Sequence, residues 1–104
     1  MASFNGGTLH IDSDQRQVMI DGNPVDLTST LYELLTTLVR HQGQVLSSEE
    51  LVELTWGESN GLTPPRLRVI VELLRVKLGW DHLGDDGSPL ETVQGQGYRW
   101  RSVA

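Results

Sequence analysis

The spacing of hydrophobic residues changes twice along this chain, and that change limits the folds it can adopt. Hydrophobic residues alternate with polar ones up to Leu27, repeat every three or four residues from Leu31 to Leu78, and alternate again after Pro89. Alternation is typical of half-buried strands, and the longer period is typical of amphipathic helices. We therefore expect an α+β fold with a sheet first, helices second and a strand pair last.

The N-terminal part is expected to form an antiparallel sheet over about residues 8–27. Three short runs carry its alternating apolar residues, which are Leu9, Ile11, Val18, Ile20, Val25 and Leu27. Turn-forming residues separate these runs at 12–14 and 21–24. The pattern predicts three strands here.

Three helices are expected over about residues 29–79. Ser47 and Glu50 are spaced as in a capping box, which marks the start of the second helix. Thr63 and Pro64 give the third helix an N-cap followed by a proline, whose missing N–H costs little in the first turn. The helical period therefore breaks into three separate helices.

The C-terminal part is expected to form a β-hairpin over about residues 90–101. Its two alternating runs flank a turn that contains Gly95 and Gly97. Three helices followed by a hairpin form the winged version of the helix-turn-helix. In that fold the third helix enters the DNA major groove, and the hairpin reaches the neighbouring backbone.

The composition fits one domain spanning residues 1–104. The chain has no cysteine, which excludes disulfides and thiolate metal sites and is compatible with a cytoplasmic location. No apolar run approaches the roughly 20 residues that a membrane helix needs. The N-terminus has no basic stretch followed by an apolar one, so we expect neither a signal peptide nor a membrane partner.

The net charge of −6 argues against DNA binding, since DNA binders usually carry an excess of basic residues. The distribution of charge changes that conclusion. The predicted third helix carries Arg66, Arg68, Arg75 and Lys77 against a single acid, Glu72. A basic helix on an acidic body can still direct DNA to one face.

At this point the sequence resembles the OmpR/PhoB-type winged-helix effector domain of bacterial response regulators, over nearly its whole length. The matching residues are Leu27-Thr28, Glu33-Leu34-Leu35, Gly43, Val45-Leu46-Ser47, Glu50-Leu51, Trp56-Gly57, Leu74-Arg75-x-Lys77-Leu78-Gly79 and Glu91-Thr92-Val93-x-Gly95-x-Gly97-Tyr98-Arg99-Trp100. The resemblance implies a four-stranded N-terminal sheet, a three-helix core and a C-terminal wing. It also implies a DNA-binding transcriptional regulator of a two-component phosphorelay, usually fused behind a phosphorylated receiver domain.

These residues include no receiver, and the sequence leaves open whether this is an excised or a stand-alone effector. The resemblance further implies that the segment 57–61, whose only charged residue is Glu58, can contact RNA polymerase. A solvated loop is the competing interpretation of that segment. A homodimer on paired half-sites is a further expectation.

The residues that depart from the family pattern lie on the predicted reading surface. Pro65, Ile70, Glu72 and Leu73 replace an arginine, a histidine and a basic pair of the third helix, and Gln94 replaces a basic residue of the wing. The family positions that remain are Arg75, Thr92 and Tyr98. This chain therefore matches the family pattern better in the residues of the fold than in the residues of the DNA-contacting face.

The outward face of the third helix is expected to carry Val69, Leu73 and Val76, spaced i, i+4 and i+7. In one interpretation Val69 and Leu73 touch thymine methyl groups while the flanking basic residues hold phosphates. In a second, the three residues and Glu58 belong to a protein-binding surface. In a third, another part of the chain covers them.

The residues that we predict to contact DNA are Arg66, Arg68, Val69, Leu73, Arg75, Lys77, Thr92, Gln94, Tyr98 and Trp56. Trp56 can either donate its indole N–H to a phosphate or close a helix corner. Tyr98 can contact phosphate, pack on the third helix, or do both. Gln94 can bond a phosphate or remain a solvated turn residue.

Enzymatic function is not expected. His10, His41 and His82 show no paired metal-ligand spacing, and no nucleophile motif is present. Gly95-x-Gly97 follows a strand but opens no helix, so it does not form a phosphate-binding loop. We therefore predict no catalytic residue, no metal site and no cofactor.

Overall fold

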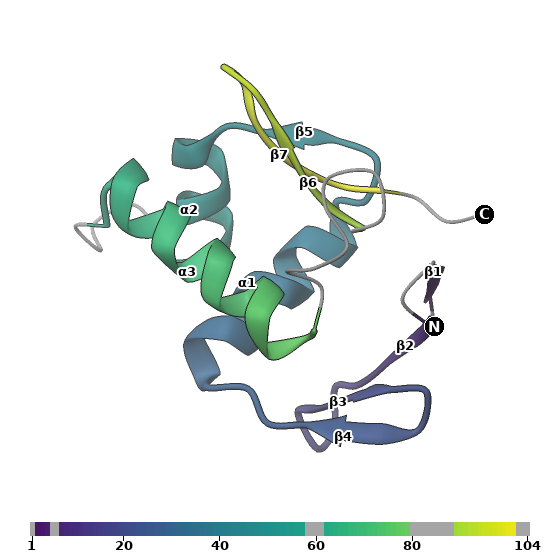
Figure 1. Cartoon of the computed structure of the whole chain (residues 1–104). Helices are drawn as coiled ribbons and strands as arrows, with labels where there is room; N and C mark the ends of the chain where they lie inside the picture. The colour runs from purple at the N-terminus through teal and green to yellow at the C-terminus, as the bar shows by residue number, and fades with distance from the viewer. Residues whose placement is uncertain (1, 5–6, 58–61, 80–88, 102–104) are drawn as a thin grey trace.

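The computed structural model describes residues 2–4, 7–57, 62–79 and 89–101 (Figure 1). The elements are β1 (Ala2–Phe4), β2 (Gly7–Asp12), β3 (Gln17–Ile20), β4 (Asn23–Val25), α1 (Ser29–Arg40), β5 (Val45–Leu46), α2 (Ser48–Trp56), α3 (Pro64–Lys77), β6 (Leu90–Val93) and β7 (Gly97–Trp100). Two sheets thus flank a three-helix core, as expected for a winged helix.

The N-terminal sheet contains four antiparallel strands in the order β1-β2-β3-β4. The alternation pattern predicted only three strands, which is wrong because β1 has three residues and no alternation continues beyond it, whereas the alternation at the equally short β4 continues to Leu27. The four strands agree with what the resemblance implied. Leu9 and Val18, each 1% exposed, point from this sheet into the core.

The second sheet joins the wing to the strand that precedes α2. Its order is β5-β7-β6, with Leu46 opposite Tyr98 and Leu90 opposite Trp100. The two-residue strand β5 was not predicted. It depends on Gly97, because a Cβ on Gly97 would lie 1.9 Å from the Leu46 carbonyl oxygen.

Local capping groups fix where the helices begin. The Thr28 hydroxyl accepts a hydrogen bond from the Leu31 N–H at the start of α1. Ser47 and Glu50 form the predicted capping box of α2, with both hydrogen bonds at 3.1 Å. At α3, Thr63 occupies the N-cap position, makes no side-chain cap, and is followed directly by prolines.

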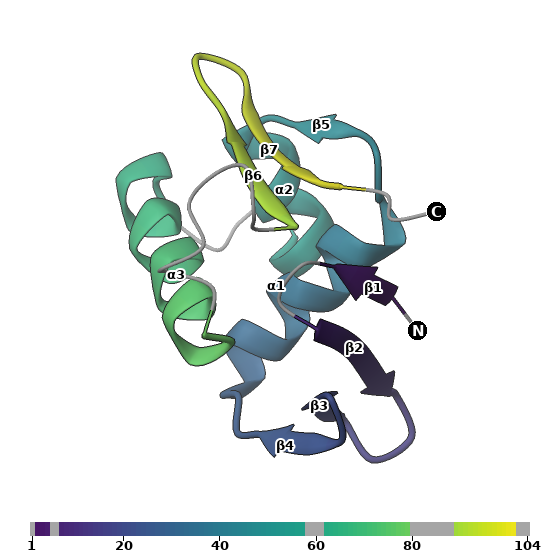
Figure 2. The ribbon, with the colours of Figure 1, turned by 45° about the vertical axis from the view of Figure 1, so that its right-hand side comes forward.

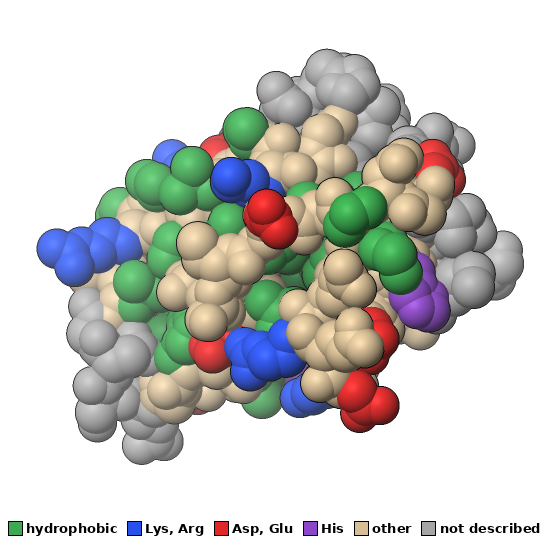
Figure 3. Space-filling view, turned by 90° about the horizontal axis from the view of Figure 1, so that it is seen from below, with side chains coloured by type: hydrophobic (Ala, Val, Ile, Leu, Met, Phe, Trp, Pro, Cys, Tyr) green, Lys and Arg blue, Asp and Glu red, His purple; other side chains and the backbone are tan. Residues whose placement is uncertain are grey.

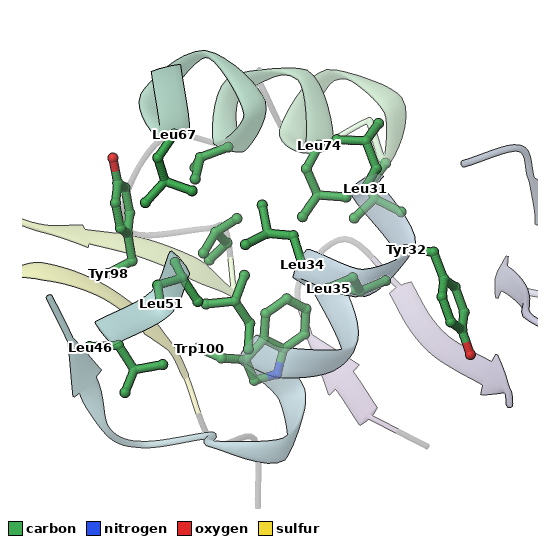
Figure 4. Close-up of a cluster of buried hydrophobic side chains, with 14 of the residues drawn as sticks. Leu31, Tyr32, Leu34, Leu35, Leu46, Leu51, Leu67, Leu74, Tyr98 and Trp100 are labelled. Atoms are coloured by element: carbon green, nitrogen blue, oxygen red, sulfur yellow. The ribbon is translucent and has the colours of Figure 1, made fainter. Parts of the chain in front are cut away.

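The core lies where the three helices meet the wing (Figure 4). On α3, the inward face is buried, and its residues are Leu67, Val71, Leu74 and Leu78. Trp100 of β7 is 1% exposed and fills the space between the wing and the helices. None of the described helices is long and apolar enough to cross a membrane.

Candidate nucleic-acid interface

The outward face of α3 carries the predicted apolar stripe, which consists of Val69, Leu73 and Val76. These side chains are 59%, 51% and 55% exposed, although large hydrophobic residues are usually buried. Within residues 7–57, 62–79 and 89–101, no element covers the stripe. The stripe is open to a ligand of some kind.

Three basic side chains border this stripe. Arg66, Arg68 and Lys77 are exposed, and none of them forms an ion pair within the described part of the chain. An unpaired, hydrated cation is available to bind a phosphate without first breaking an internal contact. These three residues lie where the sequence predicted them.

Arg75 departs from the sequence-based expectation, because it does not flank the stripe as an exposed cation. The residue is only 9% exposed. Its Nη2 donates hydrogen bonds to the Leu90 carbonyl oxygen at 2.8 Å and to Thr92 Oγ1 at 2.9 Å. Arg75 therefore connects α3 to the wing strand β6 and is turned away from the outward face.

Glu72 completes this connection, which we call the helix–wing brace (Glu72, Arg75, Leu90 and Thr92). Arg75 Nη1 donates to Glu72 Oε1 at 2.5 Å. The carboxylate therefore balances one cation of α3. This ion pair was not predicted from the sequence, although the i, i+3 spacing of Glu72 and Arg75 is a known signal for one on a helix.

The wing lies beside α3 (Figure 2). A groove of about 280 Å³ separates the two, lined by Arg68, Glu72, Thr92, Gln94, Gly95 and Tyr98. Thr92 and Gln94 are exposed, whereas Tyr98 is 6% exposed and its ring lies near Leu67 (Figure 4). The fold thus brings together four of the predicted contact residues, which come from segments more than twenty residues apart.

The Tyr98 hydroxyl makes no hydrogen bond within the described part of the chain, although the ring around it is packed. In Figure 4 the oxygen lies at the end of the ring away from the backbone of β7. Because Tyr98 also lines the groove, its hydroxyl can meet a ligand there. The structure therefore allows both of the predicted roles of this residue.

A charged clamp holds the two strands of the wing together. Arg99 Nε donates to Glu91 Oε1 at 2.7 Å, and Arg101 Nη2 donates to Glu91 Oε2 at 3.3 Å. Burial raises the pKa of Glu91, but the bonds and positive charges of the two arginines outweigh it and hold the pKa below its ordinary value. This clamp was not predicted from the sequence, although the hairpin register places Glu91 opposite Arg99.

Trp56 is half-buried at the end of α2 and packs against the core. This position fits the interpretation that it closes the helix corner, and part of the ring remains accessible. Glu58 and the rest of the segment 58–61, the predicted polymerase contact, lie outside the described residues. No cluster of three or more metal-ligating side chains occurs in the described part of the chain.

Acidic and basic side chains lie on other parts of the surface as well as on α3. Figure 3 shows hydrophobic and basic side chains together on the side where α3 lies in Figure 1, with acidic side chains nearby. The candidate interface is therefore a mixed surface of an apolar centre, basic borders and a polar wing. An overall acidic chain can present such a face to a polyanion.

The family described as "Transcriptional regulatory protein, C terminal" matches residues 22–100. The chain belongs to this family. Its match spans all three helices and the wing, including the helix–wing brace. The OmpR/PhoB-type resemblance found in the sequence is thereby confirmed.

Two curated relatives are response regulators. The response regulator ArlR of Staphylococcus saprophyticus is 39% identical over 88 residues, which cover 85% of this chain and 39% of that protein. The two-component response regulator PhoP of Pseudomonas aeruginosa is 32% identical over 97 residues, which cover 93% of this chain and 42% of that protein. The chain thus spans about two fifths of the length of these relatives.

Solved structures of the family share the fold. The RstA DNA-binding domain of Klebsiella pneumoniae, in complex with the RstA box, is 30% identical, with a TM-score of 0.78 over 95% of this chain and 94% of that one. The DNA-binding domain of CpxR from E. coli is 34% identical, with a TM-score of 0.70 over 92% of each chain. These likenesses confirm the winged-helix architecture.

Proposed function

We propose that this domain binds double-stranded DNA as a transcriptional regulator, with α3 in the major groove and the wing on the adjacent backbone. One observation carries the proposal. Arg66, Arg68 and Lys77 are exposed around the outward face of α3 and form no ion pair with any residue that the structure describes, and Arg68 also lines the groove between α3 and the wing. The related RstA domain, which has the same fold, was solved with its DNA element.

The roles of the remaining residues follow from their positions. Thr92, Gln94 and Tyr98 line the wing side of the groove, where they can bond phosphates and set the orientation of the domain. Trp56 is half-buried, and its indole N–H is proposed as one more phosphate donor. Arg75 acts indirectly, since its guanidinium is occupied by the helix–wing brace.

The small number of exposed cations has a consequence for affinity. Three phosphate contacts give a slope of about −3 in a plot of log K against log salt. Such a slope is shallow, so one domain alone binds modestly. We therefore propose that tight operator binding uses a homodimer on paired half-sites.

The regulatory context is also a proposal. The curated relatives are response regulators more than twice as long as this chain. We propose that the domain acts as the DNA-binding part of such a two-component regulator. Contact with RNA polymerase through the segment 57–61 remains a prediction.

A matched pair of variants tests DNA binding. The double variant Arg66→Ala/Arg68→Ala removes two exposed cations of α3, and Arg40→Ala removes one exposed cation of α1. In fluorescence anisotropy titrations the double variant should lose affinity, and its salt slope should become shallower by about 2. The Arg40→Ala control should bind as the parent does. Equal behaviour of the double variant and the control would contradict the proposed orientation.

A second candidate function is protein binding through the stripe of Val69, Leu73 and Val76, because each side chain is more than half exposed. The variant Leu73→Arg separates the two functions. If α3 enters DNA, the added cation should strengthen binding at low salt. If the stripe binds protein, the same change should abolish partner binding or self-association and leave DNA affinity unchanged.

A further inference from the structure

The centre of the outward face of α3 has no hydrogen-bonding side chain free to read a base. The outermost positions are Pro65, Val69, Leu73 and Val76, which carry no side-chain donor or acceptor. The basic residues of α3 border this centre, where phosphates would lie. Beside this centre, Glu72 is the one hydrogen-bond acceptor that a side chain of α3 offers to a base.

Glu72 is already engaged. Its Oε1 accepts a 2.5 Å hydrogen bond from Arg75, which is itself fixed to Leu90 and Thr92 of the wing. Rotating Glu72 toward a cytosine amino group would break this charge-assisted bond. The helix–wing brace thus withdraws the only acidic acceptor from base recognition.

We infer that α3 recognises DNA through thymine 5-methyl groups, which contact Val69 and Leu73; this inference rests on the proposed function. The methyl of thymine is the one apolar group that a base pair displays in the major groove. Residues four apart on a helix lie about 6 Å apart along its axis, close to two base-pair steps of about 3.4 Å. The operator half-site should therefore contain thymines within about two steps of each other.

Deoxyuridine provides a direct probe of this contact, because it pairs as thymine does and lacks only the 5-methyl group. After the preferred site is selected, each thymine is replaced in turn by deoxyuridine, and affinity is measured by anisotropy. We expect about a fourfold loss at one or two neighbouring positions and no loss elsewhere. Equal affinity for every substituted site would overturn the inference while leaving DNA binding intact.

A double-mutant cycle assigns the contact to the stripe. Leu73→Ala should lose sensitivity to deoxyuridine at one position and keep it at the position read by Val69. Leu54→Ala is the matched control, since Leu54 of α2 is 50% exposed, as against 51% for Leu73, and lies outside α3. It should retain the full deoxyuridine effect at both positions. Sensitivity that persists unchanged in both Leu73→Ala and Val69→Ala would overturn the assignment.

Two other outcomes separate this inference from the proposed function. If no selected or random duplex binds, the proposed function fails and the inference fails with it. If DNA binds without deoxyuridine sensitivity and the DNA-free protein forms a dimer that Leu73→Ala dissociates, the stripe is a protein interface. That result would overturn the recognition of thymine methyl groups and leave the proposed DNA binding intact. Sedimentation velocity of the free protein supplies this second measurement.

Discussion

Arg75 of α3 donates a hydrogen bond from Nη2 to Oγ1 of Thr92 in the wing, over 2.9 Å. This contact joins the two elements that are proposed to touch DNA at the same time. A helix in the major groove and a wing on the backbone act together only if their relative orientation is fixed. The brace gives Arg75 a positioning role, in contrast to the phosphate contact predicted from sequence.

Arg75→Ala should therefore lower stability and leave the salt slope unchanged. The variant loses the hydrogen bonds that the guanidinium donates to Glu72, Leu90 and Thr92. Because the donor is charged, this loss should lower the free energy of unfolding by about 2–3 kcal/mol. Urea unfolding measures the change in stability, and DNA titrations at several salt concentrations measure the salt slope. Arg68→Ala is the control, with unchanged stability and a slope shallower by about 1. A stable Arg75→Ala variant with a shallower slope would restore the phosphate-contact role.

Gly97→Ala should be strongly destabilising. A Cβ at this position would lie 1.9 Å from the Leu46 carbonyl oxygen, which belongs to the partner strand, and φ is 146°. Relieving that clash means separating β5 from β7, which should cost about 3 kcal/mol or more.

Gly95→Ala provides the matched control. Gly95 also has a positive φ, of 77°, but its Cβ would meet nothing within 4 Å. The only cost of alanine at this position is then its left-handed backbone conformation, about 1–2 kcal/mol. Thermal denaturation of both variants should rank Gly97→Ala well below Gly95→Ala, and the reverse order would contradict the role assigned to the Gly97–Leu46 approach.

The Glu91 clamp predicts a specific acid dependence of stability. Arg99 and Arg101 hold the pKa of Glu91 below its ordinary value of 4.5 in the folded protein. The unfolded chain thus takes up the proton first. The contribution of the Glu91 clamp to the free energy of unfolding is therefore complete above about pH 4.5 and is lost as the pH falls through the folded-state pKa. Glu91→Gln should flatten the decline of unfolding free energy below pH 4.5. An unchanged decline would show that other carboxylates account for it.

Tyr98→Phe tests the hydroxyl that lines the groove beside α3. The ring is 6% exposed and stays in place, so the free energy of unfolding should change by less than about 1 kcal/mol. If the hydroxyl bonds a phosphate, affinity should fall about tenfold. Unchanged affinity would limit Tyr98 to packing.

The helices could be predicted from sequence because local chemistry defines them. The Ser47–Glu50 capping box and the Thr63–Pro64 start appear at the predicted positions. The inward face of α3 was equally readable from its helical period. Strand β5 was missed because two residues are too few to show alternation, and β1 was missed because its three residues are not part of a longer alternating run.

The site was predicted less well, since its contacts depend on tertiary structure. Helical periodicity placed Arg75 near the edge of the outward face. It could not show that β6 supplies acceptors there, because Leu90 and Thr92 lie fifteen and seventeen residues further along the chain. The exposure of Leu73 followed from the same periodicity and is confirmed.

Selection from a random DNA library is the sharpest test of sequence-specific DNA binding by this domain. The protein is used to select from a random double-stranded DNA library at low salt, and the enriched sequence is titrated by anisotropy against a scrambled duplex. We expect an enriched motif that contains closely spaced thymines and is bound well above the scrambled duplex, with a half-site spacing that reports any dimer. No enrichment, with only weak salt-sensitive binding to every duplex, would contradict sequence-specific binding.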